Sequence, residues 1–133
     1  MQFRGGMVAC TALLAWSVTD IALAQSVRQF AGVAAFYSSD YSGRTACGDM
    51  YDPKKFTAAH RSLPFGTRLR VTDPKSQRSI VVVVNDRGPF TKGRVLDLSL
   101  AAAKALRMTD RGLMKITAAV ESDTKFTTAV TTP

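Results

Sequence analysis

The sequence predicts a mainly β fold, a small closed β-barrel with one short helix. Five consecutive β-branched residues at 80–84 are typical of a strand. Other short apolar segments recur along the chain, separated by connections that contain Gly and Pro. A single Ala-rich segment at 100–108 has the composition of a helix. Short strands, long connections and one small helix together indicate a barrel, although periodicity does not supply the strand order.

The first part of the chain contains one strand and one long loop. Residues 27–37 are rich in strand-forming residues and end in aromatic side chains, so they predict the first strand. The polar, Gly-containing segment 38–52 has no period and predicts a loop, and long loops in compact domains are usually functional. Residues 56–60 are short and ambiguous, and 63–66 predict a turn.

A hairpin follows. Residues 67–72 alternate polar and apolar side chains, the pattern of a half-buried strand. A turn at 73–76 allows 80–84 to pair back against this strand. Because 80–84 has no polar position, we expect it to be buried on both faces. Gly88 and Pro89 then force a turn.

The helix is predicted from its N-cap. Ser99 can accept a hydrogen bond from the first turn of a helix at 100–108. Gly112 ends this region, and residues 113–120 predict a last strand. The Thr-rich segment 121–133 predicts a flexible C-terminal tail.

The segment 1–24 has the features of a cleaved export signal. Arg4 precedes an apolar stretch at 7–18, and a small-x-small cleavage site follows. The stretch is too short for a stop-transfer helix, and Cys10 lies too early in it for lipid anchoring. We therefore expect a periplasmic or secreted protein that is not lipid-anchored. Its mature chain would have no transmembrane segment and would carry the barrel domain at 25–120.

The charge narrows the class of partner. The chain has 18 basic and 10 acidic residues, a formal net charge of +8. A basic surface suits nucleic acid, an anionic membrane or an acidic polymer. Export argues against nucleic acid, so cell-wall polymers are the expected partner of a protein that we expect to be a monomer. Arg68, Arg70, Lys75 and Arg78 are either a solvated face or part of the polymer-binding surface.

No metal or cofactor is expected. After removal of the leader only Cys47 would remain, so an internal disulfide is excluded. We interpret this thiol as a buried small hydrophobe, with a reactive nucleophile as the alternative. One Cys and one His cannot close a zinc site. No serine nucleophile elbow, phosphate-binding loop or dinucleotide motif is present.

Two carboxylates lie at the edges of predicted strands. Asp86 follows the apolar run, and Asp97 has apolar neighbours on both sides. This placement is costly unless the carboxylate is paired or used. Structural interpretations compete with a functional one, because Asp86 could bond nearby backbone in a turn and Asp97 could stabilise the following helix.

Five motifs carry a resemblance to a known family. They are GVAAFY at 32–37, GRTACGD at 43–49, TAAHRSLPFGT at 57–67, VNDRGPF at 84–90 and RVLDLS at 94–99. In this order and spacing they closely resemble the rare lipoprotein A (RlpA-like) family. The resemblance implies a six-stranded double-psi β-barrel related to expansin domains. It also implies lytic transglycosylase activity on peptidoglycan glycan strands stripped of their stem peptides.

Carried over by position, the resemblance supplies the candidate site. The candidate catalytic residues are Asp86, His60, Asp49 and Asp97. The candidate substrate-binding residues are Tyr37, Thr45, Asn85, Arg87 and Arg61. The chain departs from the family at Asp49, where the family usually has the longer Glu, and at Cys47, where a small polar residue is usual. We also expect neither the lipid-anchoring Cys nor the separate peptidoglycan-binding domain of many members.

Cleavage of a glycosidic bond needs a proton for the leaving oxygen and stabilisation of positive charge at the anomeric carbon. In a lytic transglycosylase, as the resemblance implies, the sugar's own 6-hydroxyl attacks, so one group serves as acid and then as base. We predict Asp86 in this role, oriented by His60, with Asp97 as the second carboxylate. Asp49 would polarise the sugar from the loop, unless a loop shift exchanges it with Asp52.

Alternatives stay open at this point. His60 could be an ordinary satisfied core or surface residue. The whole domain could be a non-catalytic, expansin-like module that binds cell-wall glycan. It could also be a secreted interaction protein that keeps the barrel for another purpose.

Overall fold

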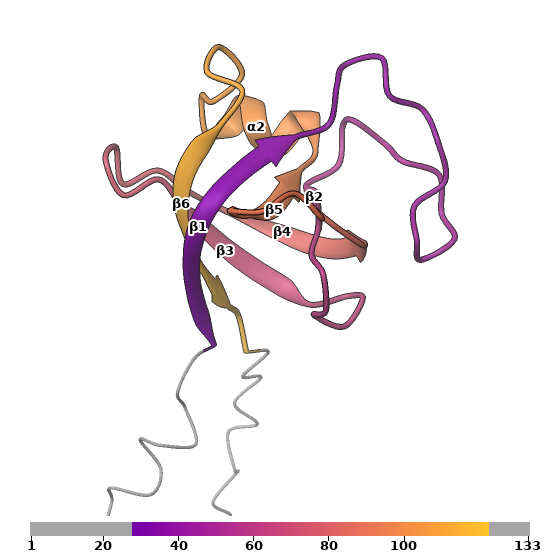
Figure 1. Ribbon diagram of the computed structural model, residues 1–133, viewed down its shortest axis with the longest axis horizontal. Helices are drawn as coiled ribbons and strands as arrows, with labels where there is room; N and C mark the ends of the chain where they lie inside the picture. Colours follow the sequence, from indigo (N-terminus) through magenta and orange to yellow (C-terminus); the bar gives the residue numbers. More distant parts are fainter. Residues whose placement is uncertain (1–27, 123–133) are drawn as a thin grey trace, which may run out of the picture.

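The computed structural model describes residues 28–122, which form six strands and one helix (Figure 1). In chain order these are β1 (Gln29–Phe36), β2 (Thr57–Ala59), β3 (Arg68–Thr72), β4 (Ser79–Asp86), β5 (Arg94–Leu98), α2 (Leu100–Ala105) and β6 (Met114–Val120). The predicted leader at 1–24, Cys10 and the tail from 123 onward lie outside the described residues, so these predictions stay predictions.

The six strands close into a barrel in the order β1-β5-β2-β4-β3-β6. Two neighbouring pairs are parallel, β1 with β5 and β2 with β4, and the other pairs are antiparallel. Parallel partners need a long crossover connection, so their pairing cannot be read from local sequence. The prediction of a mainly β, six-stranded barrel with one short helix is confirmed.

The barrel interior is filled by alternate residues of each strand. In β4, Val82 and Val84 are fully buried, whereas the side chain of Val83 points outward and the residue is 38% exposed. The expectation that this strand is buried on both faces is therefore wrong. A barrel strand has one inner and one outer face, and a uniform apolar run conceals which residue lies on which.

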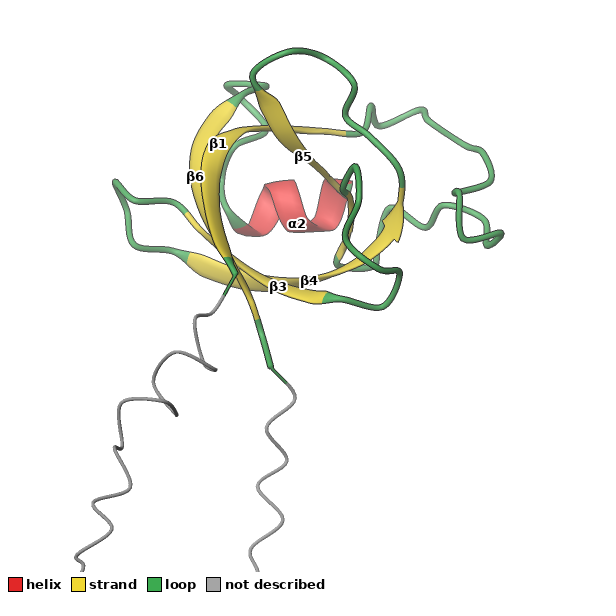
Figure 2. Cartoon of the chain, turned by 60° about the horizontal axis from the view of Figure 1, so that its bottom comes forward, coloured by secondary structure: helices red, strands yellow, loops and turns green. Residues whose placement is uncertain are grey.

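Helix α2 lies across the opening of the ring of strands (Figure 2). Ser99 Oγ accepts a hydrogen bond from the Ala102 N–H (3.3 Å), which confirms the predicted N-cap. Ala102 and Ala103 are buried in the core of the barrel. The helix ends at Ala105, before the predicted boundary at 108, because Arg107 adopts a left-handed backbone conformation (φ 55°) that stops it.

The other predicted elements are present with small shifts at their ends. The expected hairpin is the antiparallel pair β3–β4, and the expected first and last strands are β1 and β6. The ambiguous segment 56–60 contains β2. The predicted loop 38–52 contains only an isolated bridge between Arg44 and Met50, and it stands out from the barrel in Figure 1. Within residues 28–122, no helix has the length and apolar character needed to cross a membrane.

Candidate active site

The Asp86 carboxylate lies at the end of β4, where the strand meets the Gly-Pro turn. It accepts hydrogen bonds from the Tyr37 hydroxyl (2.5 Å), the Ala46 N–H (2.8 Å) and the Arg87 N–H (2.9 Å). These donors come from the end of β1, from the long loop and from the turn. Local bonding within a turn accounts for only the contact with Arg87. We call Asp86, Tyr37 and the two backbone N–H groups the Asp86 site.

Tyr37 is half-buried among aromatic side chains. Its ring stacks on Tyr41 with 5.1 Å between centroids and packs against Tyr51 at 4.7 Å. Burial, and then the hydrogen bond to Asp86, raises the pKa of Tyr37 well above its ordinary value. The hydroxyl therefore stays protonated and remains a donor to the carboxylate. The charge of Asp97 raises the same pKa, so Asp97 lies within electrostatic reach of this hydroxyl.

Asp97 lies in β5, opposite Ala35 of β1 and Ala59 of β2. Its carboxylate forms an ion pair with Arg94, three residues earlier in the chain. The helix that follows is capped by Ser99, so capping does not account for Asp97. The second predicted carboxylate is thus paired with a cation beside the Asp86 site.

The loop segment 44–50 is bonded to the end of β4. The Cys47 N–H donates to the Asn85 carbonyl (3.2 Å). The Thr45 N–H and hydroxyl both donate to the Asp49 carbonyl (2.7 and 2.8 Å). Thr45 is buried, so its hydroxyl holds the loop together, and Asn85 acts here through its backbone. Thr45 and Asn85, which were predicted to bind substrate, hold the loop in place beside the Asp86 site.

The Asp49 side chain is exposed and is not bonded to Asp86. Its carboxylate lies 3.7 Å from the Cys47 thiol, which also contacts the Thr45 hydroxyl (3.2 Å). Cys47 is free and only half-buried, so its interpretation as a buried hydrophobe is wrong. The thiol is not part of the core, because the loop that carries it lies on the outside of the barrel and surrounds it with polar groups.

The His60 side chain forms no hydrogen bond with the Asp86 carboxylate. The two residues are joined through the backbone, where the His60 N–H donates to the Asp86 carbonyl (3.1 Å). The imidazole Nδ1 accepts from the Ser62 and Leu63 N–H groups (3.1 and 3.0 Å), and the ring packs against Phe30 at 5.2 Å. The expectation that His60 orients Asp86 is therefore wrong, since Tyr37 holds the carboxylate instead.

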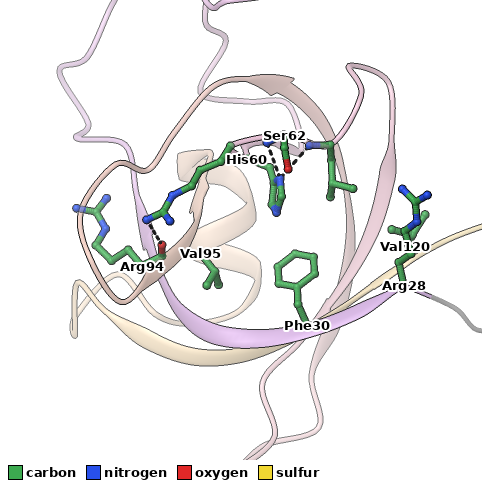
Figure 3. A pocket seen from close by; sticks show the side chains of 9 residues that line it. Arg28, Phe30, His60, Ser62, Arg94, Val95 and Val120 are labelled. Carbon is green, nitrogen blue, oxygen red and sulfur yellow. Dashed lines mark hydrogen bonds between the residues drawn. The ribbon is translucent and has the colours of Figure 1, made fainter.

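His60 lies in a cavity of about 440 Å³ beside the first residues of β1, which we call the His60 cavity (Figure 3). Burial, and then the positive charges of Arg87 and Arg61, lower the pKa of His60 below its ordinary value of 6.5. The ring is consequently neutral at pH 7. A neutral ring whose Nδ1 accepts two hydrogen bonds carries its proton on Nε2.

Arg61 and Arg87 hold the surrounding loops. Arg61 donates to the carbonyls of Pro89 (2.6 Å), Thr91 (3.1 Å) and Arg94 (3.3 Å). The Arg87 guanidinium donates to the carbonyls of His60 (3.2 Å) and Leu63 (2.7 Å), and it lies 4.0 Å from the centre of the Phe65 ring. Both residues were predicted to bind substrate, and in this structure both guanidinium groups fix protein backbone.

Sequence reasoning missed three contributions to the site. Ala46 acts through its backbone N–H, which leaves no signal in the side chain. Tyr41 and Tyr51 form an aromatic cluster with Tyr37, and the Tyr51 hydroxyl also accepts from the Leu100 N–H (3.0 Å). Three tyrosines within 15 residues are visible in the sequence, but only the folded loop brings their rings together.

The described part of the chain offers no group of three or more His, Cys, Asp or Glu side chains that could hold a metal ion. The Asp86 site itself offers a fixed carboxylate with a phenol donor and a second, arginine-paired carboxylate nearby. Such an arrangement can move a proton to and from a bound ligand.

Comparisons with known proteins agree with this architecture. A family model described as "Lytic transglycolase", for a double-psi β-barrel domain, matches residues 29–118. The chain is 52% identical over 98 residues to the "Probable endolytic peptidoglycan transglycosylase RlpA" of a Nostoc species, a match that covers 71% of this chain and 26% of that protein. It is 45% identical over 83 residues to the "Endolytic peptidoglycan transglycosylase RlpA" of Pasteurella multocida, covering 62% of this chain and 28% of that protein.

Solved structures with the same fold have other described roles. A Clavibacter michiganensis expansin, an aspartate-to-asparagine mutant in complex with cellohexaose, superimposes with a TM-score of 0.58 at 26% identity over 72% of this chain and 52% of its own. The Streptomyces papain inhibitor gives a TM-score of 0.59 at 26% identity, over 71% of this chain and 96% of its own.

The chain spans about a quarter of the length of the two curated relatives named above. The family model, in contrast, covers most of the barrel, from the first residue of β1 into β6, and more than half of the 133 residues. The chain belongs to the RlpA-like lytic transglycolase family of double-psi β-barrel domains.

Proposed function

We propose that this protein is an exported endolytic peptidoglycan transglycosylase that cleaves glycan strands free of stem peptides and leaves 1,6-anhydro ends. Membership of the family and the names of the relatives support the reaction class. The observation that carries the proposal is the Asp86 carboxylate, fixed by donors from three separate segments. A group that exchanges protons with a substrate must be held in one geometry, and these bonds hold it.

In the proposed reaction, protonated Asp86 gives its proton to the glycosidic oxygen as the bond from that oxygen to the anomeric carbon breaks. The 6-hydroxyl of the same sugar attacks the anomeric carbon, and its proton passes to the Asp86 carboxylate. The acid is thereby restored and no water is consumed. The Tyr37 hydroxyl, which donates to Asp86, stabilises the carboxylate while it carries its charge.

The positive charge that develops at the anomeric carbon needs a negative neighbour. Asp97 supplies a second carboxylate, and its ion pair with Arg94 fixes the side chain. Arg61 donates to three carbonyls and so holds the loop that leads into β5. This loop supports the position of Arg94 and Asp97. In this proposal Asp86 exchanges protons and Asp97 stabilises charge.

Two further observations support a polysaccharide of the cell wall as substrate. The net charge of +8 favours an anionic polymer. The similar expansin is described in complex with cellohexaose, an oligosaccharide, so the same fold binds a sugar chain in that protein. Export rests on the features of residues 1–24 alone.

Mass spectrometry of the products tests the proposal. The full chain is incubated with peptide-free glycan strands, and the fragments are compared with those from a hydrolytic glycosidase. A lytic transglycosylase gives fragments lighter by one water, with 1,6-anhydro ends. Hydrolytic products, or intact strands in the presence of folded protein, would overturn the proposal.

One observation favours a second candidate, a non-catalytic glycan-binding module. The resemblance places a Glu at position 49, and here the shorter Asp49 is exposed and forms no hydrogen bond with Asp86. If this residue is needed for cleavage, the chain would bind glycan without cutting it. Strands that co-sediment with the protein and stay intact would identify this case.

A further inference from the structure

The His60 cavity combines an apolar surface with an unused hydrogen-bond donor. Phe30, Leu63, Val95 and Val120 supply the apolar side chains that line it. His60 points into the cavity toward Phe30, as Figure 3 shows. Its Nδ1 is occupied by two backbone N–H groups, so Nε2–H is the atom that a ligand can reach.

Positive charge surrounds this donor. Arg28 and Arg94 lie on opposite sides of the cavity in Figure 3, and Arg61 also lines it. No acidic side chain of the described residues lines the cavity. The charge of Arg94 is paired with Asp97, so Arg28 and Arg61 supply the positive charge that favours an anionic ligand.

Part of this donor capacity is unused. The Arg28 side chain forms no hydrogen bond or ion pair with the described residues. Arg94 Nε is buried and has no partner within 28–122, although another nitrogen of the same guanidinium is paired with Asp97. Buried donors without an acceptor are uncommon in proteins, so Arg94 Nε keeps hydrogen-bonding capacity beside the cavity, while the exposed Arg28 is the donor that a ligand can reach directly.

We propose that the His60 cavity binds a carboxylate carried on a short apolar group, with His60 Nε2–H and the arginine side chains as its donors. The apolar part of the ligand would contact Phe30 and its apolar neighbours. This inference rests on the proposed function for the identity of the ligand. In peptidoglycan, the free lactyl group of a muramic acid residue has this chemistry, a methyl group beside a carboxylate, and it exists only where the stem peptide has been removed.

The terminal carboxylate of a stem peptide has similar chemistry and is the other possible source. The cavity would then select peptide-bearing wall in place of bare strands. Either source is consistent with a carboxylate site, and the binding experiment distinguishes them.

Binding is measured by calorimetry with three probes: a peptide-free muramic-acid oligosaccharide, an N-acetylglucosamine oligomer of equal length, and a free stem peptide. Asp86→Asn is present in every full-length protein, so that no ligand is cleaved. We expect the muramic-acid oligosaccharide to bind more tightly than the neutral oligomer. Arg28→Gln should weaken only the former, by about threefold to fivefold, because an exposed ion pair is worth less than about 1 kcal/mol.

Arg111→Gln is the matched control, because it removes the same charge from an exposed arginine that lines a different cavity, near the start of β6. This variant should bind all three probes as the parent does. His60 is the single histidine of the chain, so its ring signals in NMR are unambiguous. They should shift with the muramic-acid oligosaccharide and stay in place with the neutral oligomer.

Equal affinity for the charged and neutral oligomers, together with no effect of Arg28→Gln, would overturn the carboxylate site. Binding of the stem peptide alone, with the same sensitivity to Arg28→Gln, would keep the site and overturn the glycan strand as its source. Because binding and cleavage are measured separately, anhydro products from a protein without this binding behaviour would refute the inference and leave the proposed function standing.

Discussion

The Asp86 site and the His60 cavity begin at adjacent backbone positions but have opposite hydrogen-bonding states. The Asp86 carboxylate accepts three hydrogen bonds, all from within the protein. The His60 cavity instead has donors on Arg28 and on Arg94 Nε that find no acceptor among residues 28–122. A carboxylate held by three bonds is fixed in position and keeps a lone pair for proton exchange, whereas donors without a protein acceptor are available for binding. Asp86 and His60 are neighbours through the hydrogen bond between their backbones, and they can therefore have different roles.

The substitution expected to have the largest effect is Asp86→Asn. Asn keeps the volume and can still accept from Ala46, but it cannot exchange a proton with the sugar. We expect turnover of peptide-free strands to fall at least ~100-fold, the usual contribution of a positioned acid. A folded variant with undiminished turnover would move the proton transfer to Asp97 or Asp49.

Much of the fold could be predicted, because its signals are local. The alternation at 67–72, the turn at 73–76 and the apolar run at 80–84 suffice for the hairpin β3–β4. The parallel pairs β1–β5 and β2–β4 could not be predicted, since they join segments that are distant in the chain.

Some residues of the site could likewise be predicted from local sequence, and others could not. Asp86 could be identified because a carboxylate stands where an apolar run meets a Gly-Pro turn. Its partner Tyr37 is 49 residues away, and that contact exists only in the closed barrel. The prediction that His60 orients Asp86 was wrong because the ring's partners depend on the turn at 62–63, whose N–H groups donate to Nδ1.

Arg87→Gln should produce the next largest effect, on stability. The guanidinium donates to two carbonyls and stacks on Phe65, and all of these contacts are lost. Hydrogen bonds from a charged group are worth about 1.5 to 3 kcal/mol, so we expect the free energy of unfolding to fall by about 2 kcal/mol. Urea denaturation measures it. The exposed Arg111→Gln should change stability by less than about 0.5 kcal/mol, and equal losses in both variants would show that Arg87 does not hold the loop.

Tyr37→Phe tests whether the phenol supports the Asp86 carboxylate. The ring and its stacking remain, and only the hydrogen bond of 2.5 Å is removed. Loss of one bond to a charged group predicts about a tenfold decrease in kcat. Tyr41→Phe makes the same chemical change on the stacked neighbour, which does not contact Asp86. A decrease of equal size in both variants would contradict the role given to Tyr37.

The smallest effect is the pH dependence that His60 gives to stability. Its folded pKa is lowered from 6.5, so the unfolded chain binds more protons as the pH falls through this value. Stability should therefore be fully present above about pH 6.5, fall as the pH drops below it, and level off below the folded pKa. Denaturation curves between about pH 7.5 and 5.5 measure this, and His60→Asn should remove the slope. A wild-type slope of opposite sign would mean that the ring gains a negative partner.

The central claim is that the Asp86 site performs the chemistry and the His60 cavity binds the strand. The most direct measurement compares kcat and KM of Asp86→Asn and His60→Asn on peptide-free glycan. Asn at position 60 can accept from Ser62 and Leu63 in place of Nδ1, but it lacks the Nε2–H donor. We predict that Asp86→Asn lowers kcat with little change in KM, and that His60→Asn raises KM far more than it lowers kcat. A loss of kcat in His60→Asn as large as that in Asp86→Asn would contradict the claim and make the histidine part of the chemistry.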